Sequence, residues 1–176
     1  MDETLKYPAG KVHYPPGYEP NAIASCIQEI ESLPGDVKNT VLRLSEEQLN
    51  TKTMPGVWSV RQVIHHTVDS HINAFTRFKL ALTEESPVIK PYDEGKWAQL
   101  PDSLNAPVEL SVALLEALHK RWVFLLRAMN AEDFSRAFHH PDSGKNIPLW
   151  QAVSMYAWHG RHHLAHVKLL LEKKGW

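Results

Sequence analysis

The sequence predicts an all-α protein: a four-helix bundle with a long crossover loop and an irregular, proline-rich N-terminal arm. Four long segments carry apolar residues at helical spacing, and the connections between them differ widely in length. Residues 7–20 hold six prolines and glycines, a density that prevents regular structure. A chain of 176 residues can bury a full core, so we expect one domain over residues 1–176, with residues 1–20 as the arm.

The composition restricts the classes of partner. A formal net charge of -1 and a pI near 6.8 lack the positive excess that nucleic acid or an anionic membrane surface would attract. No apolar run is long enough to span a bilayer, the first residues do not have the pattern of a secretion signal, and the lone Cys26 excludes an internal disulfide. We therefore expect a soluble, cytoplasmic protein that acts on a small molecule.

The first helical pattern begins near Asn21 and is interrupted at Leu33-Pro34-Gly35. The apolar positions on both sides of the interruption keep helical spacing: Ile23, Ile27, Ile30, Val37, Val41 and Leu44. A proline inside a helix either kinks it or ends it. The segment is therefore one kinked helix or two helices, and we favour the kinked helix.

The second helix is predicted from Ser59 to Thr83. It follows a loop that ends at Pro55-Gly56, and Ser59 with Gln62 three residues later has the form of a capping box. One broad apolar stripe contains Val60, Val63, Ile64, Thr67, Val68, Phe75, Phe78 and Leu82. Residues 86–107 then form a long loop with four prolines and a group of acidic and aromatic residues, which is a common composition for a functional loop.

A third helix is predicted from Val108 to Met129 and a fourth from Leu149 to Lys173. The expected inner face of the third helix is Leu110, Leu114, Ala117, Leu118, Leu125 and Met129. The expected stripe of the fourth helix is Leu149, Ala152, Val153, Tyr156, Leu164, Val167, Leu170 and Leu171. Between the two helices, residues 134–148 fit a loop or a short hairpin equally well.

Histidines gather in two places, and facing helices of a bundle can bring such clusters together around a metal ion. The first group is His65, His66 and His71, and the second is His159, His162, His163 and His166. On the last helix, His163 falls within the apolar stripe and His159 at its edge, whereas the other two lie further round. The inward pair is spaced i, i+4, which lets two imidazoles chelate one ion.

The residues between this pair are Gly160-Arg161-His162, so the glutamate of an HExxH zinc protease is missing and that class is excluded. Two alternatives remain for the pair: metal ligands, or hydrogen-bonded core histidines with the other two histidines solvated. On the second helix, His71 falls near the centre of the stripe, His66 lies about 60° outside its edge, and His65 points away. Periodicity alone therefore favours His71 as a third ligand.

Several stretches in the same order closely resemble the YfiT branch of the DinB superfamily over nearly the whole chain. They are Pro55 through His71, Arg77-Phe78-Lys79-Leu80-Ala81-Leu82, Ile89-Lys90-Pro91-Tyr92 and Trp158 through His166. The resemblance implies a homodimeric four-helix bundle that binds one divalent ion, Zn²⁺ or Ni²⁺, through His66, His159 and His163. It agrees with the projection for the last helix and selects His66 over His71 on the second.

Three neutral imidazoles leave a position open for water or substrate, as catalytic sites do. The resemblance implies a metal-dependent hydrolase, with a metal-dependent transferase of a low-molecular-weight thiol such as bacillithiol as the alternative. A third possibility, a metal-binding stress protein without turnover, requires a fourth ligand such as His162, His71 or Asp69.

Other residues are candidates for supporting roles around such a site. Acidic side chains that could orient the histidine rings are Asp69, Asp93 and Glu94. Arginines that could anchor an anionic substrate are Arg77 and Arg161. Tyr92 and Trp97 could cover the mouth of the site. The sequence identifies neither the general acid or base nor the substrate.

Overall fold

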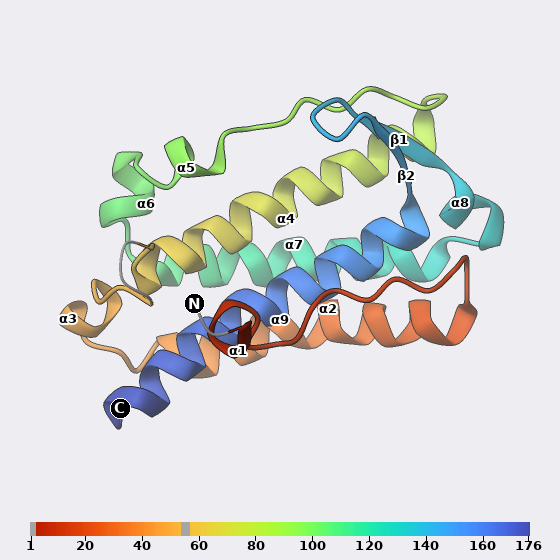
Figure 1. Ribbon diagram of the computed structural model, residues 1–176. Coiled ribbons are helices and arrows are strands. Elements are labelled where there is room, and N and C mark those ends of the chain that lie inside the picture. The colour runs from red at the N-terminus through yellow and green to blue at the C-terminus, as the bar shows by residue number, and fades with distance from the viewer. Residues whose placement is uncertain (1–2, 54–56) are drawn as a thin grey trace.

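Four long helices lie side by side and confirm the predicted all-α four-helix bundle (Figure 1). The computed structural model describes residues 3–53 and 57–176. The long helices are α2 (Pro20–Val41), α4 (Val60–Thr83), α7 (Val108–Ala128) and α9 (Leu149–Lys174). Within the described part of the chain, no helix is both long and apolar enough to cross a membrane.

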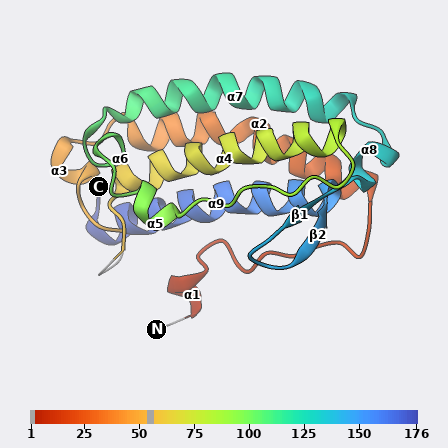
Figure 2. The same ribbon diagram turned by 90° about the horizontal axis from the view of Figure 1, so that it is seen from above.

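The order of packing differs from the order along the chain. Helices α2 and α4 each pack against both α7 and α9, so the consecutive helices α2 and α4 lie across a diagonal of the bundle. Helices α4 and α7 run in the same direction, and the chain between them returns along the whole bundle (Figures 1 and 2). This return is the predicted crossover, and it contains two short helices, α5 (Glu94–Trp97) and α6 (Pro101–Asn105).

The N-terminal arm lies over the bundle, as expected from its prolines and glycines. After the short helix α1 (Glu3–Lys6), it runs as an extended chain beside α9 (Figure 2). The indole Nε1 of Trp158 donates a hydrogen bond to the carbonyl of Gly10 at 2.8 Å. The hydroxyl of Tyr14 lies 3.7 Å from the sulfur of Met155. Both contacts attach the arm to α9.

Helix α2 continues through Pro34 without a break, so the alternative of two separate helices is wrong. Proline has no N–H, and the carbonyl four residues earlier, that of Ile30, therefore has no partner inside its own helix. The helix persists because apolar side chains on both sides of the proline are buried in the core, among them Leu33 and Val37. The packing of these side chains outweighs the lost backbone hydrogen bond.

Helix α4 begins with the predicted capping box. The Ser59 hydroxyl accepts from the Gln62 N–H at 3.2 Å, and the Gln62 side chain accepts from the Ser59 N–H at 2.9 Å. The predicted loop end at Pro55-Gly56 lies outside the described residues. In the first turn of the helix, the buried guanidinium of Arg61 donates to the carbonyl of Ala106 and joins the crossover to α4.

Residues 134–148, which the sequence left as loop or hairpin, include a hairpin. Its strands are β1 (Ala137–His140) and β2 (Lys145–Pro148), which pair antiparallel. The short helix α8 (Ala131–Ser135) directly precedes β1, and the remaining short helix, α3 (Glu46–Leu49), lies between α2 and α4. The turn contains Gly144 at φ +63°, a left-handed conformation that glycine adopts without strain. The carbonyl of His139 accepts from the Ile89 N–H at 3.1 Å, so the hairpin holds the crossover in place.

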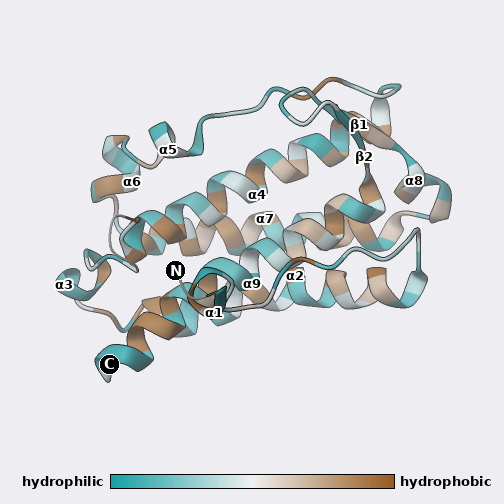
Figure 3. Cartoon of the chain, in the orientation of Figure 1, coloured by the Kyte–Doolittle hydropathy of each residue, from teal (hydrophilic) through white to brown (hydrophobic). Residues whose placement is uncertain are grey.

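Hydrophobic residues run along all four long helices (Figure 3). The predicted stripe of α9 is buried throughout, and that of α4 is buried except at Phe75 and Leu82, which are half-buried. The predicted inner face of α7 is wrong, since Leu110 is 63% exposed and Leu114 48%. The buried face of α7 consists of Val108, Ser111, Val112, Leu115, His119, Trp122, Val123 and Leu126.

The error on α7 has a physical cause. Helix α7 has apolar residues on more than one side, and on its leucine-rich side Leu110 and Leu114 face solvent, whereas Leu118 and Leu125 are half-buried. Two polar residues, Ser111 and His119, lie on the buried side, where both are hydrogen-bonded. A search for apolar periodicity counts such residues as outward-facing, although hydrogen bonds allow polar groups to be buried.

Helices α9 and α2 are in close contact at Gly160. A Cβ atom built on Gly160 would lie 2.2 Å from Cδ2 of Leu33, which is itself buried. No side chain fits there unless Leu33 moves. By contrast, a Cβ on Gly35, in the middle of α2, would meet nothing within 4 Å.

We expect Gly160→Ala to lower the free energy of unfolding by about 1 kcal/mol, because overpacking costs about 1–3 kcal/mol and exceeds the roughly 1 kcal/mol gained from alanine's helix propensity. In a Leu33→Ala background the clash is gone, and Gly160→Ala should then stabilise by about 1 kcal/mol. Gly35→Ala is the control and should stabilise in either background. Urea unfolding measures each glycine substitution in both backgrounds. Stabilisation by Gly160→Ala in the wild-type background would contradict the close contact.

Candidate metal centre

Three of the predicted histidines meet between α4 and α9. His66 extends from the second turn of α4, behind the Ser59 cap, and His159 and His163 extend from consecutive turns of α9. One nitrogen of each ring belongs to a group in which all donor atoms lie within 4.8 Å of one another. The structure thus brings together the set that the family resemblance selected.

The three rings form a compact triangle. The Nε2 atoms of His159 and His163 are 3.1 Å apart, and the ring centroids of His66 lie 5.3 Å from His159 and 4.8 Å from His163. Trp58 packs against His66 with its ring centroid at 4.6 Å, on the side of the helix start. The indole therefore fixes the ring that is contributed from α4.

Burial keeps these imidazoles neutral. It lowers the pKa of His66 to about 4, partly opposed by the negative charge of Glu94. It also lowers the pKa of His159 and His163 well below the usual value of histidine, and the neighbouring imidazoles add to this effect. Neutral imidazole has a free lone pair, which is the form that binds metal ions.

His71, which periodicity alone favoured, is not in the group. Its ring is fully buried, with Nε2 at 3.4 Å from Nδ1 of His159 and Nδ1 at 2.8 Å from Nε2 of His119. His119 in turn contacts the carbonyl of Ile30 through Nδ1 at 2.5 Å. His71 is thus a hydrogen-bonded neighbour of the cluster.

Sequence reasoning missed His119. The signal that could have found it is its place in a regular 4-3-4-3-4 spacing on α7, formed by Val108, Val112, Leu115, His119, Trp122 and Leu126. A histidine in such a row is expected to be buried. Its partners, however, come from α2 and α4 and cannot be read from the spacing.

The remaining histidines of the two groups have structural contacts. His65 is buried, contrary to its outward projection, and its ring contacts the Ser111 hydroxyl at 2.7 Å. His162 and His166 are not solvated as one alternative supposed, because their Nε2 atoms are 3.2 Å apart and His162 stacks on Trp158. His162 also packs edge-on against His163, with ring centroids 5.4 Å apart, but none of these three histidines belongs to the group of converging donor atoms.

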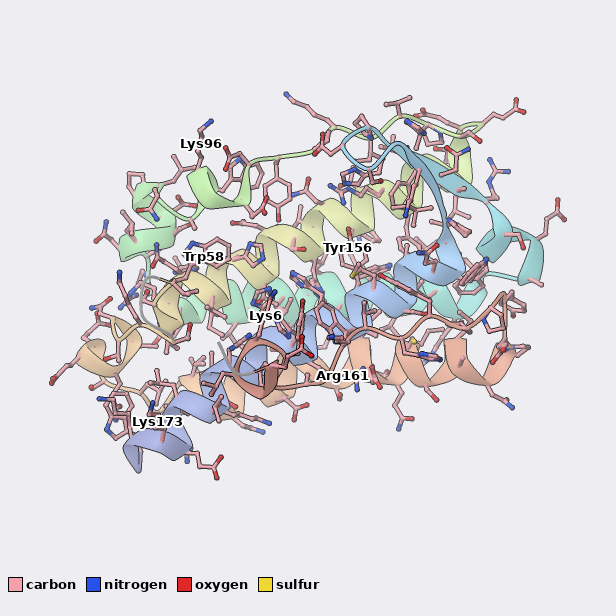
Figure 4. All side chains as sticks on the ribbon, viewed as in Figure 1. Lys6, Trp58, Lys96, Tyr156, Arg161 and Lys173 are labelled. Atoms are coloured by element: carbon pink, nitrogen blue, oxygen red, sulfur yellow. The ribbon has the colours of Figure 1, made fainter. Side chains whose placement is uncertain are left out.

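A cavity of 570 Å³ opens beside the triangle. Figure 4 labels two of its lining residues, Trp58 before α4 and Tyr156 on α9. The walls come from α4, α9, the crossover and the hairpin: Trp58, His66, Ser70, Arg77, Pro91, Tyr92, Glu94, His140, Asp142, Met155, Tyr156, His159 and His163. The crossover and the hairpin thus form part of the cavity wall, beside the two helices.

Of the two candidate arginines, only Arg77 lies in this cavity. Its guanidinium donates to the Tyr156 hydroxyl at 2.9 Å. No carboxylate among the described residues is within ion-pair distance of it. Arg161 instead pairs with Glu29 at 3.0 Å and lines a different cavity beneath the arm. Arg77 is therefore the cation that faces the site.

The loop residues also separate into two groups. Tyr92 and Glu94 line the cavity, and burial raises the pKa of Tyr92 to about 12. Trp97 packs on Tyr92 with ring centroids 4.5 Å apart and does not line the cavity. Asp93 caps α5 by accepting from the Lys96 N–H, so its carboxylate is used locally.

Asp69, the third acidic candidate, is half-buried on α4 and is not among the residues that line the cavity. Burial and the charge of Asp102 raise its pKa to about 6. Its carboxylate thus lies beside the wall of the site and not in it.

The free energy of unfolding of the metal-free protein should fall as the pH is lowered from 6.5 towards 4. Burial lowers the pKa of His119 to about 4 and that of His71 well below its ordinary value, whereas both titrate near 6.5 when unfolded. In this pH range the unfolded chain binds more protons than the folded one. Each such histidine therefore lowers the free energy of unfolding by about 1.4 kcal/mol for every pH unit of acidification. Urea unfolding in chelator at pH 7.5, 6.5 and 5.5 measures the slope. His119→Gln should reduce this slope by the contribution of one proton, about 1.4 kcal/mol per pH unit. A free energy of unfolding that does not change with pH would contradict the burial of neutral histidines.

Comparisons with known proteins agree with this geometry. A relative from Oceanobacillus iheyensis is 52% identical over 171 residues, which cover 97% of this chain and 98% of the relative. One from Bacillus cereus strain AH820 is 49% identical over 172 residues, 98% of each chain. Both are provisionally named metal-dependent hydrolases.

Among solved structures, YfiT from Bacillus subtilis is described as a probable metal-dependent hydrolase with an unusual four-helix bundle topology. It matches with a TM-score of 0.95 at 43% identity, over 98% of this chain and 99% of its own. The sequence profile of the DinB superfamily matches residues 29–167, from the middle of α2 to α9, and so contains all three histidines of the cluster. The chain belongs to the DinB superfamily.

Proposed function

We propose that this protein is a metal-dependent hydrolase in which His66, His159 and His163 hold one divalent ion, zinc or nickel, beside a small-molecule substrate. The observation that carries the proposal is the convergence of three imidazoles from two helices, with donor atoms within 4.8 Å, at the wall of a 570 Å³ cavity. The names of the relatives support the same class.

The donor set fits such an ion. Nitrogen ligands at about 2.0–2.1 Å from a tetrahedral zinc stand roughly 3.4 Å apart. The Nε2 atoms of His159 and His163 are already 3.1 Å apart, and a nitrogen of His66 belongs to the same group. When bound, the ion would lower the pKa of water towards about 7 and polarise an acyl oxygen.

The contacts of the three candidate fourth ligands agree better with a metal site that keeps an open position than with one saturated by protein ligands. Both nitrogens of His71 are engaged, with His119 and with His159. His162 pairs with His166, and Asp69 does not line the cavity. None of these three residues belongs to the group of converging donor atoms, and none of them lines the cavity.

The chain's own side chains supply the remaining roles. Glu94 and Asp142 line the cavity, and their carboxylates are the candidates for taking a proton from the attacking water. Tyr92, whose pKa is raised to about 12, stays protonated and can donate a hydrogen bond to the substrate. Cys26 lies in the other cavity, under the arm, where burial raises the pKa of its thiol, so it takes no part.

Metal content provides the first test. We expect about one zinc or nickel per chain in untagged protein analysed by mass spectrometry, and loss of that metal in His66→Ala, His159→Ala and His163→Ala. His166→Ala, on the same helix but outside the triangle, should keep it. If untagged protein holds no stoichiometric metal even after reconstitution, the proposal is wrong.

Substrate preference provides the second test. Arg77 faces the cavity without a carboxylate partner, so we expect esters with an anionic group to be hydrolysed preferentially. Arg77→Gln should raise the KM for such an ester about tenfold or more and leave a neutral analogue unchanged, because hydrogen bonds to charged groups contribute about 1.5–3 kcal/mol. Tyr156→Phe, which keeps the guanidinium, is the control. Equal effects of Arg77→Gln on both esters would contradict this role.

The same metal-loaded protein should be offered a low-molecular-weight thiol with an electrophile. A thiol transferase would use the same three ligands, and no contact in the cavity selects a thiol. Conjugation without hydrolysis of any ester would therefore replace the hydrolase by the transferase. The homodimer, the cytoplasmic location and the single domain over residues 1–176 stay predictions.

A further inference from the structure

We propose that His71 and His119 are positioning residues: anchored on the carbonyl of Ile30, they hold His159 in the tautomer that carries its proton on Nδ1. The lone pair of His159 Nε2 then faces His66 and His163. The use of that lone pair for a metal rests on the proposed function, whereas the tautomer itself does not.

The row of contacts takes one residue from each long helix. It runs from the Ile30 carbonyl on α2 to His119 on α7 at 2.5 Å, to His71 on α4 at 2.8 Å, and to His159 on α9 at 3.4 Å. Ile30, His71 and His119 are at most 1% exposed. Water therefore does not compete for these hydrogen bonds.

Pro34 explains why the anchor exists. In an α-helix the carbonyl of residue 30 accepts from the N–H of residue 34, but proline has no N–H, and its ring displaces that carbonyl. A buried carbonyl without a partner is costly. His119 supplies the missing donor, so the proline that interrupts the apolar pattern of α2 frees the acceptor at which the row begins.

The direction of the row follows from that end. A carbonyl oxygen only accepts, so His119 must carry its proton on Nδ1, and its Nε2 is then an acceptor. Because Nε2 of His119 accepts, Nδ1 of His71 must carry a proton and donate it to that nitrogen. Nε2 of His71 is then an acceptor in turn, so Nδ1 of His159 must carry the proton of the last hydrogen bond. The last free position is the lone pair on Nε2 of His159, 3.1 Å from Nε2 of His163.

The row is not a path for protons. The Ile30 carbonyl can neither take up nor release one, and every imidazole must keep its Nδ1 proton for the row to remain intact. Its effect is on orientation, since the tautomer of a metal-binding histidine is set by the partner of its other nitrogen. Here that partner is itself oriented by two further residues, with the last contact on α2.

The test reads tautomers by ¹⁵N NMR of metal-free protein and zinc affinity by competition with a chelating dye. In the wild type, His71, His119 and His159 should all carry the proton on Nδ1. His119→Leu removes the acceptor for His71 and should shift His159 to a mixture that includes the Nε2–H form, with zinc affinity lowered about 10- to 100-fold. His119→Gln offers one donor and one acceptor, and should keep the tautomer and an affinity within about threefold of wild type.

A proton on Nε2 of His159 in the metal-free wild type would overturn the inference even if neither variant folds. If the wild type binds zinc, an equal affinity in His119→Leu would also overturn it. The expected tautomers in a protein that binds no metal would uphold the row and reject the proposed hydrolase. Bound zinc together with a proton on Nε2 of His159 in the metal-free protein would reject the row and leave the metal site of the proposed function standing.

Discussion

The hydrogen bond between His119 and the carbonyl of Ile30 lies where all four long helices meet, and much of the interior depends on it. It satisfies a backbone group that Pro34 leaves without a helical partner. It also allows two imidazoles to be buried in an otherwise apolar core, where unpaired polar groups would be costly. A bundle held only by apolar stripes could slide by a turn, whereas this row fixes the relative heights of the four helices at one level.

The unusual helix order explains where the site opens. Because α4 and α7 run in the same direction, the chain must return along the bundle between them, and this crossover lies over the cavity that α4 and α9 also line (Figure 2). The hairpin pairs with it through Ile89 and His139. The rigid helices thus supply the histidine triangle, and the crossover and hairpin supply Tyr92, Glu94 and Asp142. Under the proposed function, this separation would allow the substrate to change within a family while the metal ligands stay in place.

Much of the fold followed from local patterns. The capping box at Ser59, the stripe of α9 and the irregular conformation of the arm are set by residues close together in sequence, and the structure agrees with each. The inner face of α7 did not follow, because buried Ser111 and His119 look polar until their partners are known. The hairpin remained undecided because its pairing with the crossover joins residues about fifty positions apart.

For the candidate site, the sequence by itself determined the pair His159 and His163, since an i, i+4 spacing places two rings on one helix face whatever surrounds them. The family resemblance predicted His66 as the third member, and the structure places its ring in the same group. Only the tertiary structure decided that His71 turns towards His119 and that Arg77, not Arg161, enters the cavity. These outcomes depend on the rotation and height of each helix against its neighbours. Side-chain packing and hydrogen bonds between distant segments fix those quantities, and no local spacing encodes them.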